Sequence, residues 1–149
     1  MRLKTEPIFQ FEKKPYTESA SIEEIEAIKN SVSIYNSQII YFKDLPVVSP
    51  FSTNIAFDKI DQLAKQMGPC RLILDVSVSD RPDAATRRAL NDRHKKISKN
   101  IRQVAFVTKS NIVVRTIIKF VMFQSVLESF TINTTFEEAE ASINKILND

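Results

Sequence analysis

Short apolar runs along the chain have either the two-residue period or the unbroken apolar character of β-strands. Residues 31–35 alternate small polar with large apolar side chains, and a turn signal at Asn36 and Ser37 separates them from a second run. This pair of runs predicts an antiparallel hairpin. Two later runs are almost wholly apolar, which indicates strands that are covered on both faces. The predicted strands are residues 31–35, 39–42, 72–76, 104–107 and 130–134.

Between these runs, apolar residues recur every three or four positions, as they do on one face of an amphipathic helix. We expect the first of these helices to begin after a break at Pro50, with Ser52 or Thr53 as its cap, and to end at Gly68. Asp83 is the predicted cap of the next one. The apolar stripes are Ala56, Ile60, Leu63, Ala64 and Met67, then Ala89, Leu90, His94, Ile97 and Ile101, then residues 112–124, and finally Ala139, Ile143, Ile146 and Leu147.

Taken in order, these elements predict one α/β domain of order ββαβαβαβα over residues 31–149. Alternating strands and helices favour a mainly parallel mixed sheet, and the N-terminal antiparallel hairpin forms its edge. Residues 1–30 precede this domain as an extension with one short helix, which Ser21 and Glu24 open as a capping box.

Composition excludes several classes of site. A single glycine, Gly68, rules out glycine-rich phosphate loops, and a single cysteine and a single histidine rule out a cysteine cage or a histidine-rich metal site. We therefore expect no cofactor and no metal. The first residues lack the apolar run of a secretory signal, and Arg115 and Lys119 interrupt the longest apolar stretch. We expect a cytoplasmic protein without a membrane span.

Four segments carry a resemblance to a known family: Leu72–Ser77, Val104–Thr108, Asn111–Arg115 and Phe130–Ala139. Together with the order of elements, they resemble the STAS fold of anti-sigma-factor antagonists and the related bacterial STAS-like proteins of CRAL-TRIO character. The resemblance covers about residues 31–149. It implies a largely non-catalytic fold whose members bind partner proteins, some of them with a phosphorylatable serine or a small ligand.

The phosphoryl acceptor of the antagonists has no counterpart here. In that family an Asp-Leu-Ser strand end is followed by Asp-Ser-Ser-Gly at the start of the next helix. When Asp75–Ser77 is aligned with the first motif, Asp83–Thr86 falls on the second. Alanine then stands at both serine positions, so we expect no stoichiometric phosphate on residues 83–86, where Thr86 has the only hydroxyl group.

Polar side chains follow the predicted parallel strands, where open α/β sheets bind ligands. Asp75 and Arg115 are candidates to orient a polar ligand or a phosphate beside a helix N-terminus. In the alternative, Asp75 and Ser77 satisfy loop amides and Arg115 is solvated. The candidate residues at these strand ends are Asp75, Ser77, Ser79, Asp80, Thr108, Ser110, Asn111 and Arg115.

The helix that begins at Ile112 has an unusual solvent side. Arg115 and Lys119 mark this side, and Met122 and Phe123 continue it. Large apolar residues there predict a patch that something covers. The cover is either the extension of residues 1–30 or another molecule, such as a second copy in a homodimer.

These observations favour a non-enzymatic binding or regulatory module that acts through protein–protein contacts with an unknown partner. The alternative is a carrier of a small ligand or lipid, with an apolar pocket lined by Ile117, Phe120 and Val121. Nucleic-acid binding is a weaker third class. Residues 81–102 carry eight basic and two acidic side chains, a net charge of +6, but residues 81–105 hold no aromatic side chain to stack on bases. We expect His94 and Cys70 to be structural.

Overall fold

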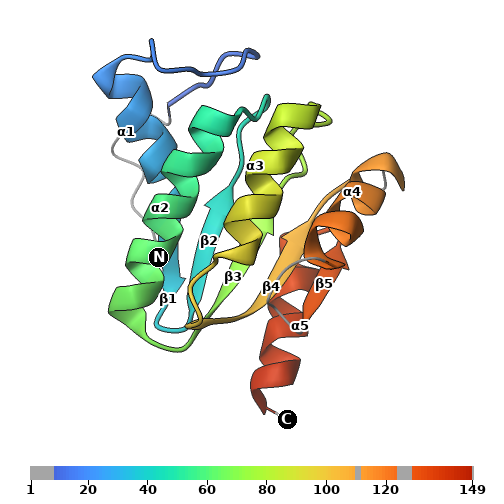
Figure 1. The fold of residues 1–149 in the computed structure, drawn as a ribbon. Helices are drawn as coiled ribbons and strands as arrows, with labels where there is room; N and C mark the ends of the chain where they lie inside the picture. The colour runs from blue at the N-terminus through green and yellow to red at the C-terminus, as the bar shows by residue number, and fades with distance from the viewer. Residues whose placement is uncertain (1–8, 110–111, 124–128, 149) are drawn as a thin grey trace.

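A computed structural model describes residues 9–109, 112–123 and 129–148. In this part of the chain one mixed sheet has the strand order β1-β2-β3-β4-β5 (Figure 1). The strands are β1 (Val32–Asn36), β2 (Ile39–Lys43), β3 (Cys70–Asp75), β4 (Ile101–Val107) and β5 (Phe130–Asn133). The helices are α1 (Ile22–Asn30), α2 (Pro50–Met67), α3 (Ala84–Lys95), α4 (Ile112–Phe123) and α5 (Phe136–Asn148).

The sheet confirms the predicted α/β class and the N-terminal hairpin. Strand β1 pairs antiparallel with β2, and all later pairs are parallel. Strands β3 and β4 are parallel neighbours inside the sheet, as their unbroken apolar runs predict, because only a doubly covered position tolerates such runs.

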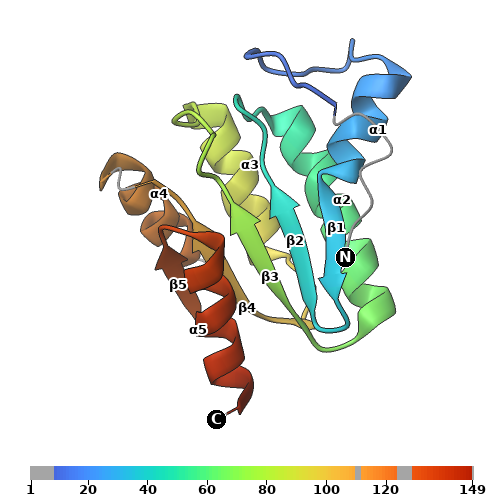
Figure 2. The same cartoon turned by 180° about the vertical axis from the view of Figure 1, so that it is seen from behind.

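Helices cover both faces of the sheet. Helices α2, α3 and α4 lie over one face (Figure 1), and α5 crosses the other (Figure 2). Side chains alternate along β3, so Leu72 and Leu74 join the core under α2, whereas Ile73 packs with Ala139 and Ile143 of α5. In the described part of the chain, none of the helices combines the length and the hydropathy that a bilayer crossing needs.

Two predicted helix boundaries were wrong. Helix α2 begins at Pro50, because proline has no amide hydrogen to lose in the first turn, and Ser49 caps it by accepting from the Ser52 amide at 3.1 Å. Helix α3 ends at Lys95, and Ile101 opens β4 instead of closing the helical stripe. The predicted stop at Gly68, with a φ of +79°, and the cap at Asp83 are confirmed.

The N-terminal extension docks on α2. Its capping box at Ser21 and Glu24 is present, and Ile28 and Tyr16 are buried with Leu45 in a small apolar cluster. The Ser49 hydroxyl also donates to the Tyr16 carbonyl oxygen at 2.6 Å. Helix α1 thus lies beside α2, away from α4 (Figure 1), so residues 9–30 are not the cover of α4, which was one of the two alternatives.

A charged cluster joins α2 to α3 at the surface. The Arg93 guanidinium lies 2.8 Å from an Asp58 carboxylate oxygen and 3.2 Å from an Asp61 oxygen, and 6.0 Å from the centre of the Phe57 ring. Asp61 also accepts from the Ser98 amide at 3.0 Å, which helps to hold the turn between α3 and β4. This cluster fixes the position of α3, whose other side lines the candidate site.

Candidate functional site

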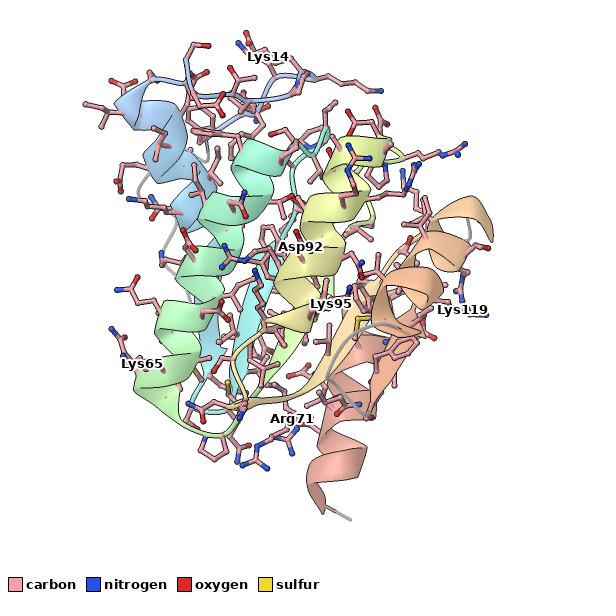
Figure 3. The ribbon with its side chains drawn as sticks, viewed as in Figure 1. Lys14, Lys65, Arg71, Asp92, Lys95 and Lys119 are labelled. Carbon is pink, nitrogen blue, oxygen red and sulfur yellow. The ribbon has the colours of Figure 1, made fainter. Side chains whose placement is uncertain are left out.

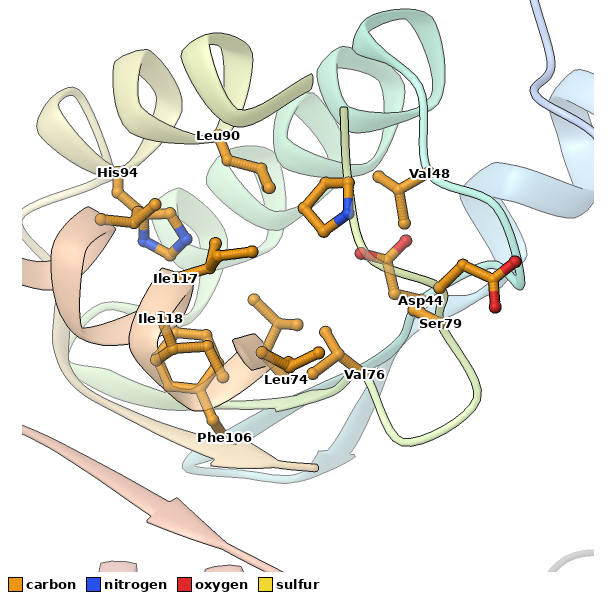
Figure 4. A pocket seen from close by; sticks show the side chains of 14 residues that line it. Asp44, Val48, Leu74, Val76, Ser79, Leu90, His94, Phe106, Ile117 and Ile118 are labelled. Carbon is orange, nitrogen blue, oxygen red and sulfur yellow. The ribbon is translucent and has the colours of Figure 1, made fainter. Parts of the chain in front are cut away.

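An apolar pocket lies at the carboxyl ends of β2, β3 and β4, between α3, α4 and the sheet (Figure 4). Its volume of about 60 Å³ is several times the ~10–15 Å³ that one water requires, and smaller than the ~300 Å³ at which drug-sized ligand pockets begin. It fits a small molecule or one end of a longer one. The lining residues are Asp44, Val48, Leu74, Val76, Ser79, Asp80, Pro82, Leu90, His94, Phe106, Val114, Ile117, Ile118 and Val121.

A buried carboxylic acid marks one end of this pocket. Asp44 follows directly on β2 and is 7% exposed. Within the described part of the chain its carboxyl group accepts one hydrogen bond, from the Leu45 amide at 2.8 Å. Burial disfavours the charged form and raises the pKa of Asp44 to about 7, against a smaller lowering by the Leu45 hydrogen bond. The group therefore changes charge near neutral pH.

A buried imidazole marks the other end (Figure 4). His94 is 2% exposed and packs between the rings of Phe57 and Phe106, whose centres lie 5.1 and 6.1 Å away. Burial lowers the pKa of His94 to about 4, so the ring is neutral at physiological pH. Its Nδ1 atom is buried and has no hydrogen-bond partner in the described part of the chain. The sequence places His94 on the core face correctly, but the ring also lines the pocket.

The loop after β3 forms the mouth of the pocket. The Ser79 hydroxyl donates to the Leu45 carbonyl oxygen at 2.7 Å, and the Asp80 amide donates to the Pro46 carbonyl oxygen at 2.8 Å. The exposed Asp80 carboxylate lies 3.6 Å from the Lys13 ammonium of the N-terminal extension. The extension thus reaches the mouth of the pocket through one surface ion pair.

The expected pair of Asp75 and Arg115 does not form a site. Asp75 faces the α5 side of the sheet, where its carboxylate accepts from the Tyr41 hydroxyl at 3.0 Å and from the Ser77 amide at 2.9 Å. Helix α4, which carries Arg115, packs on the opposite face, against Leu74. The Asp75 carboxylate thus satisfies the Tyr41 hydroxyl and the Ser77 amide of the loop. This agrees with the alternative in which Asp75 and Ser77 have a structural role. Burial and the nearby Asp75 together raise the pKa of Tyr41.

The remaining predicted residues are dispersed. Thr108 is buried, and its amide donates to the Asn133 carbonyl oxygen at 2.9 Å. Lys119 is exposed on α4 (Figure 3). The prediction that Met122 lies on the solvent side of α4 was wrong. Met122 is 2% exposed, packs in the main core and faces the sheet, so it does not form an exposed apolar patch. Asn111, Ser110 and the side chains of Phe120 and Phe123 lie outside the described residues.

Three other predictions concern the basic segment 81–102, Thr86 and Cys70. Arg88, Lys95, Lys99 and Arg102 are exposed to solvent, as Figure 3 shows for Lys95. Thr86 is fully buried, and its hydroxyl donates to the Val48 carbonyl oxygen at 3.3 Å. Cys70 is buried as predicted, and burial raises the pKa of its thiol to about 11.

The sequence analysis predicted part of the pocket lining but did not include Asp44. Asp80 and Ser79 are the predicted strand-end residues that line it, together with Ile117 and Val121 from the predicted ligand pocket. Asp44 is absent from the predicted site because the apolar run at 39–42 predicts only a strand of the antiparallel hairpin. Since β2 also runs parallel to β3, its carboxyl end opens at the same edge, and Asp44 is the polar residue there.

Comparison of the chain with models of protein families, with curated proteins and with solved structures gave no match.

Proposed function

We propose that the protein is a non-enzymatic binding module that holds a small, largely apolar molecule in the pocket between α3, α4 and the sheet. The observation that carries this proposal is an apolar cavity at the carboxyl ends of parallel strands, with a buried acid at one end and an unpaired imidazole nitrogen at the other. The Asp44 carboxyl group accepts one hydrogen bond in the described part of the chain, which leaves acceptor positions that a ligand can fill.

The contacts of the polar lining residues support binding more than catalysis. The Ser79 hydroxyl is engaged by the Leu45 carbonyl oxygen, and the His94 ring lies between two phenyl rings. Neither group is hydrogen-bonded to the other, so the lining holds no nucleophile activated by a base. The volume of about 60 Å³ favours a small molecule over a whole lipid.

A pocket-filling substitution tests the proposal. In Val76→Phe, the larger ring occupies the cavity, and we expect the affinity for a probe such as 1-butanol to fall at least about tenfold. Val78→Phe is the matched control, because Val78 lies two residues further along the same loop, is 44% exposed and does not line the pocket. Calorimetric titration measures both. Equal binding of the probe by both variants would place it elsewhere and contradict the proposal.

We also propose that the fold is STAS-like and that the module is regulatory and cytoplasmic. The order ββαβαβαβα after α1 supports the first part. The exposed Ala84 and Ala85, and a Thr86 hydroxyl that is buried against Val48, favour regulation through a ligand or partner over regulation by phosphorylation.

A second candidate function is assembly with another copy of the chain through β1. This strand forms one edge of the sheet, has no charged residue or proline, and exposes 51% of Ile34 and 46% of Tyr35. Two such edges pair antiparallel about a two-fold axis. We expect a concentration-dependent dimer in light scattering that Ile34→Lys abolishes and Val78→Lys preserves. A mass that stays monomeric at every concentration would exclude it.

A further inference from the structure

We propose that the pocket selects small alkyl amines, with the ammonium group paired to Asp44 and the alkyl chain against the apolar wall. This inference rests on the proposed function, because it names the class of ligand for the same pocket. It comes from the distribution of charge along the lining.

Every ionised group that lines the described pocket is acidic. Asp44 and Asp80 are the two carboxylic acids, His94 is neutral, and none of the described lining residues carries a permanent positive charge. A ligand carboxylate would meet like charge in a region of low dielectric constant. A ligand ammonium group would supply the positive charge that a buried, ionised Asp44 lacks. The electrostatics thus select against fatty acids and in favour of amines.

The position of Asp44 separates it from the surrounding charges. Asp80 and Lys13 form their own pair at the exposed mouth, and the Arg87 guanidinium donates to the Pro82 carbonyl oxygen at 2.9 Å. Lys43, the preceding residue, is exposed, and Asp75 faces the other side of the sheet. Of the groups around Asp44, none donates to its carboxyl group in the described part of the chain except the Leu45 amide.

The aliphatic side chains of the pocket wall require that the ligand also have an apolar part. Aliphatic side chains lie between Asp44 and His94, as Figure 4 shows for Leu74, Val76, Leu90 and Ile117. When the ammonium group is paired with Asp44, the alkyl chain of the ligand therefore extends along these side chains. At the far end, the buried and neutral His94 ring closes the pocket without adding a charge to it.

Calorimetric titration with n-butylamine, 1-butanol and butyrate tests this inference, since the three probes share an alkyl chain and differ in head group. At pH 8.5 we expect butylamine to bind at least about tenfold more tightly than butanol, because a charge-assisted hydrogen bond exceeds a neutral one. We expect butyrate to bind most weakly. The preference for butylamine should vanish in Asp44→Asn and persist in Asp92→Asn, which removes an exposed carboxylate of α3 that does not line the pocket.

The pH dependence of binding to the unmodified protein tests the role of Asp44 without a substitution. Alkyl amines stay protonated between pH 5.5 and 8.5, whereas Asp44 gains its proton below about pH 7. Butylamine should therefore bind up to about 30-fold more weakly at pH 5.5, while butanol binding stays level. If butanol and butylamine bind equally at both pH values, the amine preference is wrong and the pocket proposal stands. If none of the probes binds, both are wrong.

Discussion

Asp44→Asn should become more stable relative to the unmodified protein as the pH rises from 4 to 7, by about 4 kcal/mol in total. Burial raises the pKa of Asp44 from 3.8 to about 7 in the folded state. Between these values the folded protein keeps the proton and the unfolded chain releases it, so rising pH costs about 1.4 kcal/mol of stability per unit. Asparagine removes this loss. Urea unfolding at a series of pH values measures the difference.

His94→Gln should show the opposite trend over almost the same range. The folded protein holds His94 neutral down to about pH 4, whereas the unfolded chain protonates it below 6.5, so acid destabilises the unmodified protein by about 3 kcal/mol. The glutamine variant therefore gains relative stability as the pH falls from 6.5 to 4. In the unmodified chain the two contributions largely cancel.

Val78→Ala provides the control, because Val78 is 44% exposed and has no titratable group, so its curve of stability against pH should run parallel to that of the unmodified protein. A loss of packing in Asp44→Asn or His94→Gln lowers the free energy of unfolding equally at every pH. Such a loss shifts the curve of stability against pH and does not change its slope. If the Asp44→Asn curve is also parallel to that of the unmodified protein, burial does not raise the pKa of Asp44 as described.

Phe57→Ala should destabilise the protein at neutral pH by about 3–5 kcal/mol. Phe57 is fully buried, and its ring contacts those of Phe42 and His94 at 6.4 and 5.1 Å between centres. Its removal leaves a cavity beside His94 and takes away the ring under Arg93. Denaturant unfolding measures the loss.

Two controls accompany this prediction. Ile22→Ala, at a side chain that is 81% exposed, should change the free energy of unfolding by less than about 0.5 kcal/mol. Proton titration by NMR should show the His94 pKa of Phe57→Ala closer to 6.5, because water enters beside the ring. A loss below about 1 kcal/mol would show that the Phe57 ring is not packed as described.

The fold was largely predictable because local rules and tertiary packing agree at most elements. The apolar runs at 72–76 and 104–107 require cover on both faces, and the sheet provides it. The prediction differs from the structure where the helical spacing of apolar residues continues past the end of the helix. Ile97 and Ile101 continue the spacing of α3, but they lie in the turn after the helix and at the start of β4. Ile22 likewise keeps helical spacing and is nevertheless exposed, because α1 packs on α2 through Ile28.

The site was less predictable because its parts come from separate segments. The rule that ligands bind at strand ends pointed to the correct edge of the sheet, but it does not say which face a side chain takes. Asp75 and Val76 are adjacent, and alternation along the strand sends Asp75 toward α5 and Val76 toward the pocket. Met122 was misplaced for a related reason, since the orientation of α4 about its axis depends on packing that its sequence does not reveal.

Crystals of the unmodified protein under xenon pressure test the central claim most directly. Xenon enters small apolar cavities without the help of charge, so its density reports the cavity independently of the amine preference. We expect one xenon site bounded by Leu74, Val76 and Ile117, present in Val78→Phe and absent in Val76→Phe. A pocket that stays empty of xenon in the unmodified protein, or a site that persists in Val76→Phe, would contradict the account.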